Sequence, residues 1–396
     1  MRIVKSCIIC SSDNMKILLD LGDQPLANAL LEDASQQALL YPLVLSQCKR
    51  CLHGQISTQL EPSLLFSSNY PFLAGQSVSW LKHCKEIANM LVDYHEDLHS
   101  YESERRMIID IGSNDGTLLY ALENTLGDGY TFLGVDPSDM VVNYSRLQVM
   151  WEEAIINPGS ASLITATNVL AHTPTPHIFL SVVYYALAKN GIFYVEVPDL
   201  NEMIIHAEFS SIYHEHYSYF TLSSLISLLS SHELWPIKII ESPMHGGSIG
   251  IVCSKNPQLL MAGGCPPMQL LPDFSNEFSE AVETSIDDLY DKLISTAKQP
   301  LYGYGASAKA TVLLNYMNNM ITKSTLLPLH RLLHGVFDSA PTKIGRYIPG
   351  VNLPILSPED IPKLKPATIL ILSPNISEDL ISQAKKFGFE GDFLFI

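Results

Sequence analysis

The chain has 396 residues, of which 47% are hydrophobic and 16% are charged, and its formal net charge is −17. This composition excludes a largely disordered chain and leaves room for two or three folded domains. The acidic balance argues against a nucleic-acid binder, which needs a basic surface, although a few amides or lysines can still hold a small anionic ligand.

The N-terminus and the cysteine count favour a cytoplasmic protein. The first ten residues, MRIVKSCIIC, are too short and polar-flanked for a signal peptide, and no apolar run approaches the roughly 20 residues that cross a bilayer. Seven cysteines, an odd number, fit a reducing compartment better than a disulfide framework. We expect neither a membrane nor a nucleic-acid partner, and nothing in the sequence argues against a monomer.

The first block, residues 1–68, contains two CxxC pairs. Cys7 and Cys10 form the first pair, and Cys48 and Cys51 form the second. Two such pairs offer four thiolates to one tetrahedral ion and leave no open position, which is typical of a structural zinc site. So small a block also needs the stability that a metal supplies. Chance pairs or a redox dithiol are the alternatives to this predicted zinc-binding domain.

The second block, residues 69–255, opens with a helical stretch, SVSWLKHCKEIANMLVDY. Short apolar runs then alternate with helix-length segments, which predicts an α/β fold with a parallel sheet covered on both faces. The last two runs, IKIIESP and GSIGIVCSK, are separated by only a few residues and predict an antiparallel hairpin.

A candidate cofactor turn follows the first strand of this block, in MIIDIGSNDG (107–116). Its small residues let backbone approach a cofactor, but the pattern is not GxGxxG, and Asp110 and Asp115 would repel a diphosphate. These acids suit S-adenosylmethionine (SAM), whose sulfonium and ammonium groups are cationic. Asp136, in YTFLGVDPS, ends the next strand, where a carboxylate can accept hydrogen bonds from ribose hydroxyls. The remaining candidates of these two motifs are Gly112, Asn114, Gly116 and Pro137, and a purely structural turn is the alternative.

Two further segments carry candidate functional side chains. SASLITATNVLAHTP places Asn168 and His172 near the end of a strand, where they could line the cofactor or act only as turn and cap residues. IYHEHYSY (212–219) holds two histidines, a glutamate and three tyrosines, which would suit a metal site, an acid–base site or a polar loop. On a strand, His214 and His216 would share a face and could meet one ion, although no third ligand is evident.

The third block, residues 256–396, restarts a strand–loop–helix rhythm after a linker and an acidic amphipathic helix. In LYGYGASAKATVLLNYM, Gly303 and Gly305 leave amides free at a helix start, and Lys309 adds a positive charge. We expect a Rossmann-like domain that contributes to nucleotide binding; the alternative is a domain used only for packing. The segment lacks the Walker spacing and is a poor dinucleotide fingerprint, which weakens the alternative of a nicotinamide-dependent sugar oxidoreductase.

Together these segments resemble one family, the sugar C-methyltransferases that act on nucleotide-activated ketodeoxysugars. The resemblance extends over nearly the whole chain, through CxxC…CxxC, DIGSNDG, NVLAHTP, IYHEHYSYFT, HGGSIGI, GYGASAKATVLLNY and FDSAPTKIGRYIPG. It implies a small zinc-binding domain, a class I methyltransferase domain and a Rossmann-like C-terminal domain. It also implies methyl transfer from SAM to a ring carbon, usually C3, of a 4-keto-6-deoxy sugar on a nucleoside diphosphate such as dTDP or GDP.

The resemblance also implies roles for individual residues. His216 would be the general base that removes a proton beside the ketone, with Glu215 and Tyr213 as its supporting partners. Tyr70, in NYPFLAG, and His172 would reach the same cleft. The residues implied near the sugar nucleotide are Tyr304, Ser307, Lys309, Asp338, Lys343 and Tyr347.

Overall fold

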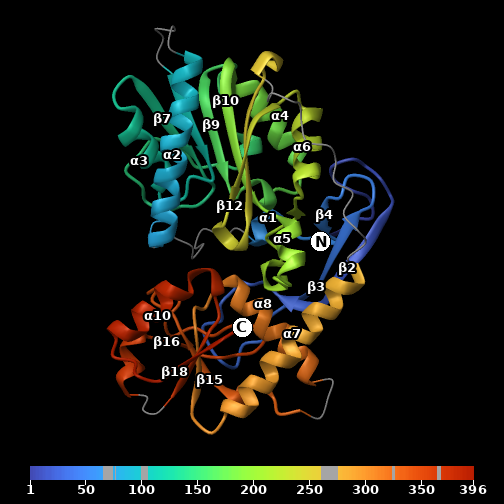
Figure 1. The fold of residues 1–396 in the computed structure, drawn as a ribbon, viewed down its shortest axis with the longest axis vertical. Helices are drawn as coiled ribbons and strands as arrows, with labels where there is room; N and C mark the ends of the chain where they lie inside the picture. Colours follow the sequence, from blue (N-terminus) through green and yellow to red (C-terminus); the bar gives the residue numbers. More distant parts are fainter. Residues whose placement is uncertain (66–74, 76, 100–105, 260–274, 323–325, 364–366) are drawn as a thin grey trace.

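Three main sheets and a small two-stranded ribbon organise the chain (Figure 1). The structure is a computed structural model that describes residues 1–65, 75, 77–99, 106–259, 275–322, 326–363 and 367–396. The predicted α/β class is confirmed, with a Rossmann-like central part and a parallel C-terminal sheet.

The N-terminal part is built on an antiparallel sheet of order β11-β4-β3-β2, with a ribbon of β1 and β5 beside it. The elements are β1(Arg2–Ile3), β2(Met15–Pro25), β3(Leu40–Cys48), β4(Gly54–Ile56), β5(Thr58–Gln59), α1(Pro62–Leu65) and β11(Ser218–Tyr219). Strand β11 is the end of the polar segment 212–219. It joins this sheet through the pairing of Ser218 with Gln55 and of Tyr219 with Gly54. Gly54 permits this pairing, since a Cβ there would lie only 2.8 Å from the Leu200 side chain.

The central sheet has the order β12-β13-β10-β9-β6-β7-β8. Its strands are β6(Arg106–Ile111), β7(Tyr130–Val135), β8(Arg146–Leu147), β9(Ala161–Thr167), β10(Leu187–Pro198), β12(Trp235–Ser242) and β13(Ser248–Ser254). The strands from β6 to β10 are parallel, whereas β13 runs antiparallel to both β10 and β12. The predicted hairpin of the last two runs is therefore confirmed.

Helices cover both faces of the central sheet, because apolar side chains point to alternate sides of its strands. Ile108 packs with the helices of one face, and its neighbour Ile109 packs with those of the other. The first face carries α2(Val78–His99) and α3(Thr117–Leu126), and the second carries α4(Pro176–Ala186) and α6(Leu222–Ser231). The short α5(Leu200–Ile205) follows β10.

The C-terminal sheet is entirely parallel and has the order β16-β15-β14-β17-β18. With its first strand in the middle, this is the strand order of dinucleotide-binding folds. The strands are β14(Leu301–Tyr304), β15(Leu333–Phe337), β16(Ile355–Leu356), β17(Thr368–Ile371) and β18(Asp392–Phe395). The helices are α7(Ser275–Thr296), α8(Ala308–Thr322), α9(Leu329–Leu332) and α10(Ser377–Lys386).

The N-terminal and C-terminal parts share one hydrophobic core. Leu43 and Leu45 of β3 belong to the same buried cluster as Ile286 of α7 and Leu313 of α8. In Figure 1, α7 accordingly lies beside β2 and β3. The two ends of the sequence thus fold against each other.

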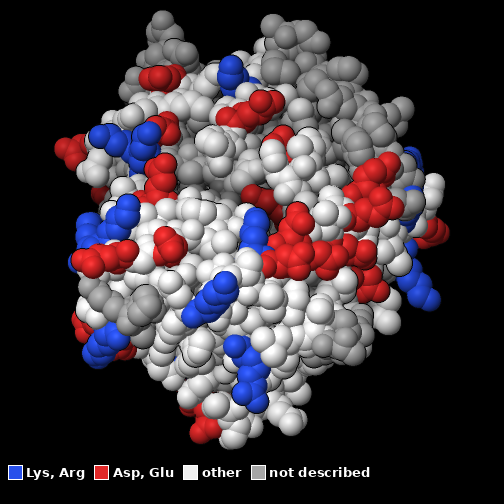
Figure 2. Space-filling model, turned by 60° about the horizontal axis from the view of Figure 1, so that its bottom comes forward, with Lys and Arg blue, Asp and Glu red and all other residues white. Residues whose placement is uncertain are grey.

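The molecular surface agrees with the acidic composition. On the face drawn in Figure 2, acidic side chains gather in a continuous patch, whereas Lys and Arg side chains are dispersed. Within the described ranges, no helix is long and apolar enough to cross a bilayer.

Candidate active site

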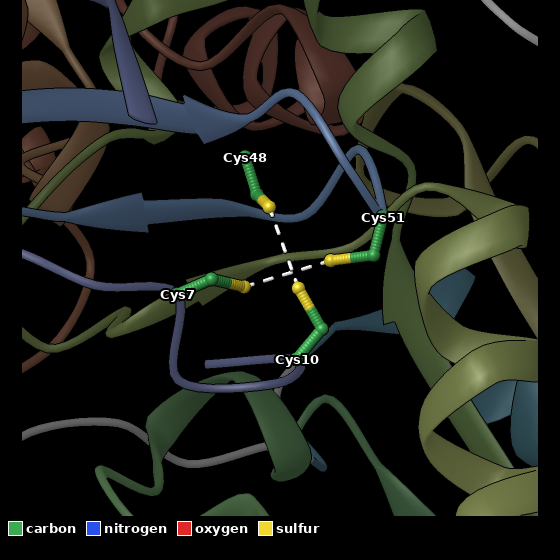
Figure 3. Close-up of side chains that lie close together, drawn as sticks. All are labelled: Cys7, Cys10, Cys48 and Cys51. Atoms are coloured by element: carbon green, nitrogen blue, oxygen red, sulfur yellow. Dashed lines mark hydrogen bonds between the residues drawn. The ribbon is translucent and has the colours of Figure 1, made fainter. Parts of the chain in front are cut away.

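The four predicted metal ligands converge in the N-terminal part, where Figure 3 shows their sulfurs pointing toward one another. The Sγ atoms of Cys7 and Cys51 lie 3.5 Å apart, as do those of Cys10 and Cys48, and all four lie within 4.8 Å of one another. Zinc–sulfur bonds of about 2.3 Å place tetrahedral sulfurs roughly 3.8 Å apart. The cluster therefore fits a structural zinc ion. It is the one group of three or more potential ligands within the part of the chain that the structure describes.

The turn after β6 has a left-handed backbone at three positions. Gly112, Asn114 and Gly116 all have positive φ, at 66°, 47° and 85°. A Cβ on Gly112 would lie 2.4 Å from Cγ2 of Val169, so glycine is needed where the turn meets the segment that follows β9. The predicted turn and the NVLAHTP segment therefore touch at the carboxyl edge of the sheet.

Three carboxylates at this edge have different surroundings. Asp110 is buried and accepts a hydrogen bond from Thr165 Oγ1 at 2.7 Å. Burial raises the pKa of Asp110 to about 7, the Thr165 hydroxyl opposes this shift, and the charge of Asp136 adds to it. A cation beside Asp110 would favour its ionised form, which suits SAM.

The other two carboxylates shape the turn. Asp136 accepts the backbone N–H groups of Asn114 and Ser138, both at 2.9 Å, and the adjacent Pro137 is exposed. Asp115 accepts from the Thr117 hydroxyl at 2.6 Å and from the Gly75 amide at 2.6 Å. The Asp115 carboxylate is therefore engaged at the start of α3.

Asn168 gives an independent sign of a ligand at this edge. Its backbone is left-handed, with φ 57°, and both polar atoms of its side chain are buried without a hydrogen-bond partner among the described residues. Leaving buried polar groups unpaired costs about 1–3 kcal/mol each. The residues at this edge therefore fit a polar cofactor, and Asp110, Asp136 and Asn168 would hold SAM there.

Next to Asn168, η3(Leu170–His172) brings His172 against the segment 212–219. The His172 Nδ1–H donates to the carbonyl oxygen of Glu215 at 2.9 Å, and burial lowers the His172 pKa to about 4. The ring is therefore neutral at physiological pH, with Nε2 as its unprotonated nitrogen.

His216 lies between His172 and Tyr213. Its ring centroid is 4.5 Å from that of His172 and 4.2 Å from that of Tyr213. The Tyr213 hydroxyl lies 2.9 Å from His216 Nε2. Burial and the charge of Glu215 raise the pKa of Tyr213 well above its usual value, so the phenol stays protonated. This is a histidine oriented by a hydrogen-bonded phenol, as an acid–base site requires.

His214 and Glu215 point to other partners. His214 Nε2–H donates to the carbonyl oxygen of Tyr41 at 3.3 Å, and Asn28 Nδ2–H donates to Glu215 Oε1 at 2.7 Å. Residues 214 and 215 form a turn and not a strand, so His214 and His216 do not share a face. The alternative of a metal ion held by this segment therefore has no geometric support.

In the C-terminal part, Asp338 organises the Gly-rich segment. It accepts the backbone N–H of Ala306 at 2.9 Å and lies 3.3 Å from the Lys343 ammonium, which also donates to the carbonyl of Ala306 at 3.0 Å. The Ser307 hydroxyl accepts the Ala310 amide at 3.2 Å. Tyr304 is fully buried and its hydroxyl donates to Gln383 at 3.1 Å, so its side chain packs between β14 and α10.

The remaining predicted residues lie between the parts. Lys309 forms a 3.4 Å ion pair with Glu208, just before η4(Phe209–Ser211); burial lowers the Lys309 pKa and Glu208 opposes that shift. Tyr347 pairs through its backbone with Leu31. Tyr70 lies outside the described residues.

Sequence reasoning missed Tyr144. Its hydroxyl donates to Asn114 O at 2.7 Å, and a Cβ on Gly134 would lie 2.3 Å from its ring. Tyr144 thereby packs against β7 and holds the turn after β6 by a hydrogen bond to its backbone. A glycine within the short apolar strand YTFLGV was the one available signal of so close a contact.

Known protein families match the chain in the same order as its three sheets. Residues 7–66 match a zinc binding domain, residues 85–234 a methyltransferase domain, and residues 270–396 a C-methyltransferase C-terminal domain. The C-methyltransferase NovU of Streptomyces niveus is 27% identical over 411 residues, covering 98% of this chain and 93% of NovU. The chain is a SAM-dependent C-methyltransferase. The predicted cofactors, SAM and structural zinc, are confirmed with it, and the nicotinamide alternative has no support.

Solved structures resemble only part of the methyltransferase. A Burkholderia thailandensis 1,6-didemethyltoxoflavin-N1-methyltransferase is 14% identical, covers 45% of this chain and 81% of its own, and gives a TM-score of 0.34. A geranyl diphosphate C-methyltransferase from Streptomyces coelicolor is 12% identical, covers 42% and 76%, and gives a TM-score of 0.30.

Proposed function

We propose that this methyltransferase methylates a ring carbon, C3, of a nucleoside-diphosphate-linked 4-keto-6-deoxy sugar through an enolate, in deoxysugar biosynthesis. The observation that carries the proposal is the contact of His216 with both Tyr213 and His172. Because His172 closely follows Asn168, this contact supports a role for His216 and Tyr213 as an acid–base pair next to the cofactor edge.

The substrate chemistry requires such a pair. When bound, SAM supplies an electrophilic methyl group. A ring carbon carries no lone pair, so the protein must first remove the proton beside the ketone. His216 takes this proton, the C–H electron pair moves toward the ketone, and the carbon becomes the nucleophile. The developing negative charge on the ketone oxygen needs a hydrogen-bond donor.

The neighbouring side chains divide the remaining tasks. Tyr213, which stays protonated, orients His216 and can donate to the ketone oxygen. Glu215 orients the segment through its hydrogen bond from Asn28, and the neutral His172 ring confines the sugar. Tyr70 completes the cleft, as the family resemblance implies.

The Gly-rich segment supports a nucleotide-linked substrate. Helix α8 begins directly after this segment, and Lys309 in its first turn contacts Glu208 beside η4. The Gly-rich segment therefore lies close to segment 212–219. The central position of β14 is the position of the nucleotide-binding strand in dinucleotide folds. We assign Ser307, Lys309, Asp338, Lys343 and Tyr347 to the sugar nucleotide, dTDP or GDP linked, and leave Tyr304 out.

We further propose three domains, at residues 1–68, 69–255 and 256–396, working as a cytoplasmic monomer. The separate matches of three family models support the division.

Mass spectrometry with a panel of keto sugar nucleotides tests the proposed reaction. Incubation with SAM and dTDP- or GDP-linked 4-keto-6-deoxyhexoses should add one methyl mass, and NMR should place the new methyl on C3. A methyl group on a hydroxyl oxygen would refute C-methylation of the sugar, and a product methylated at C5 would refute the assigned position.

A further inference from the structure

The turn of residues 26–31, just after β2, touches the segment that carries His216. Asn28 in this turn donates its side-chain N–H to Glu215 Oε1 at 2.7 Å, across 187 residues of sequence. Glu215 is 2% exposed, so this contact lies in the protein interior. A short hydrogen bond from an amide to a buried carboxylate fixes the direction of that carboxylate.

The same turn is also hydrogen-bonded to the C-terminal part. The carbonyl of Ala27 accepts a hydrogen bond from Thr311 Oγ1 at 3.1 Å, and Leu31 exchanges two backbone hydrogen bonds with Tyr347, at 2.9 and 2.8 Å. Thr311 lies two residues after Lys309 on α8. The turn therefore connects Glu215 with the helix that begins at the Gly-rich segment.

The backbone on both sides of Glu215 is also held by the N-terminal part. Strand β11 pairs with β4, and the Tyr217 hydroxyl donates to the carbonyl of Leu60 at 2.6 Å. His214 bonds to Tyr41 in β3. The zinc-stabilised sheet thus fixes the backbone of the segment, and Asn28 acts on the one carboxylate within it.

We propose that Asn28 is a positioning residue for methyl transfer, which holds the Glu215 carboxylate and, through the backbone of the segment, its neighbours Tyr213 and His216. The inference rests on the proposed role of His216. The amide suits this task because it donates a hydrogen bond without neutralising Glu215. Among the described residues, the phenols of Tyr213 and Tyr217 face the Glu215 charge, and His172 donates to the Glu215 carbonyl. Burial chiefly raises the pKa values of both phenols; the charge of Glu215 adds to both shifts, after that of Glu61 for Tyr217.

Two substitutions at this position separate orientation from folding. Asn28→Ala removes the donor, and we expect kcat to fall roughly tenfold to a hundredfold, the scale of small misplacements in an active site. KM for the sugar nucleotide and the affinity for SAM should change less than about threefold, because neither binding surface is touched. Asn319→Ala is the matched control, since Asn319 donates its side-chain amide to Asp23 O across the same interface but away from Glu215.

Asn28→Asp gives a signature that a merely structural residue would not give. Two facing carboxylates share one proton at low pH, which restores the hydrogen bond, and repel each other once both are ionised. The kcat of this variant relative to wild type should therefore fall as the pH rises from about 5 to about 8. The Asn28→Ala ratio should stay flat over the same range.

Two measurements decide the proposal. Wild-type kcat in Asn28→Ala, or a pH profile of Asn28→Asp parallel to wild type, would overturn it. Carbon-13 NMR of the Glu215 carboxyl in the free enzyme should show a raised, coupled titration in Asn28→Asp, and its absence would equally overturn the contact. Because NMR needs no substrate, failure of the proposed sugar reaction would be recognised separately: wild-type protein would be inactive on the sugar nucleotides while Asn28→Asp still showed the raised, coupled titration of Glu215.

Discussion

The imidazole rings of His172 and His216 lie edge to face, with their centroids 4.5 Å apart. His172 belongs to the segment that leaves β9 at the cofactor edge, whereas His216 lies in the segment that continues into β11 of the N-terminal sheet. The distance between the proposed base and the cofactor therefore depends on two different parts of the protein.

Replacing the proposed base should stop the chemistry without disturbing the cofactor. We expect His216→Asn to lower kcat by roughly a hundredfold or more, the scale of a lost general base. SAM affinity, measured by calorimetry, should stay within about threefold of wild type. His206→Asn is the control, because this histidine is largely exposed on nearby helix-end surface. Unchanged turnover in His216→Asn would remove it as the base.

The raised pKa of Asp110 predicts pH-dependent cofactor binding. Because this pKa is about 7 without ligand, a cationic cofactor must compete with a proton at lower pH. SAM affinity should therefore rise as the pH increases from about 6 to about 8, with proton release detected by calorimetry in two buffers. Asp110→Asn should bind more weakly and lose this dependence, whereas the exposed Asp128→Asn should keep it. A pH-independent wild-type affinity would contradict a direct role for Asp110.

The raised pKa of Asp110 also predicts that the free energy of unfolding depends on pH. A pKa raised in the folded state above the unfolded value means that stability is lost as the pH rises through about 7. Asp110→Asn should therefore be more stable than wild type in urea at pH 8 and closely similar near pH 4. Equal stabilities at both pH values would show that Asp110 is not buried in its neutral form.

Removing zinc should impair turnover more than cofactor binding. Structural zinc contributes on the order of 10 kcal/mol in small domains, so chelation or Cys48→Ser should loosen the sheet that pairs with β11. We expect faster amide exchange in β4 and β11, a lower melting temperature and at least roughly tenfold lower kcat. SAM binding should change little, since the cofactor turn lies in the other sheet. Cys84→Ser, at a cysteine outside the cluster, controls for loss of a thiol; full activity of the zinc-free protein would contradict this coupling.

Lys309 should matter for substrate affinity and not for chemistry. Lys309 lies in the first turn of α8, next to Ser307 of the Gly-rich segment that we assign to the sugar nucleotide. Lys309→Ala should raise KM for the sugar nucleotide about tenfold and leave kcat within a few fold. Lys292→Ala, on the exposed face of α7, should behave as wild type. A KM insensitive to Lys309 would place the diphosphate elsewhere.

Local sequence patterns were sufficient to predict much of the structure of this protein. Paired cysteines, alternating apolar runs and a glycine-rich turn are each set by residues close in sequence, so they predicted the cysteine cluster, the α/β class and a turn after the first strand of the central sheet. They could not specify a side chain's direction where it depends on a distant partner: Tyr304 packs in the core with its hydroxyl on Gln383, and His214, left unassigned from the sequence, turns toward β3.

The sequence by itself determined which chemical groups are available, because each motif carries its own ligands, acids and bases within a few residues. Only the tertiary structure decided how they meet. The pairing of β11 with β4 brings the segment of His216 into the sheet of the zinc-binding part, and a hydrogen bond across 187 residues joins Asn28 to Glu215. Such contacts leave no periodic trace in the sequence, since they arise from packing between segments that fold far apart along the chain.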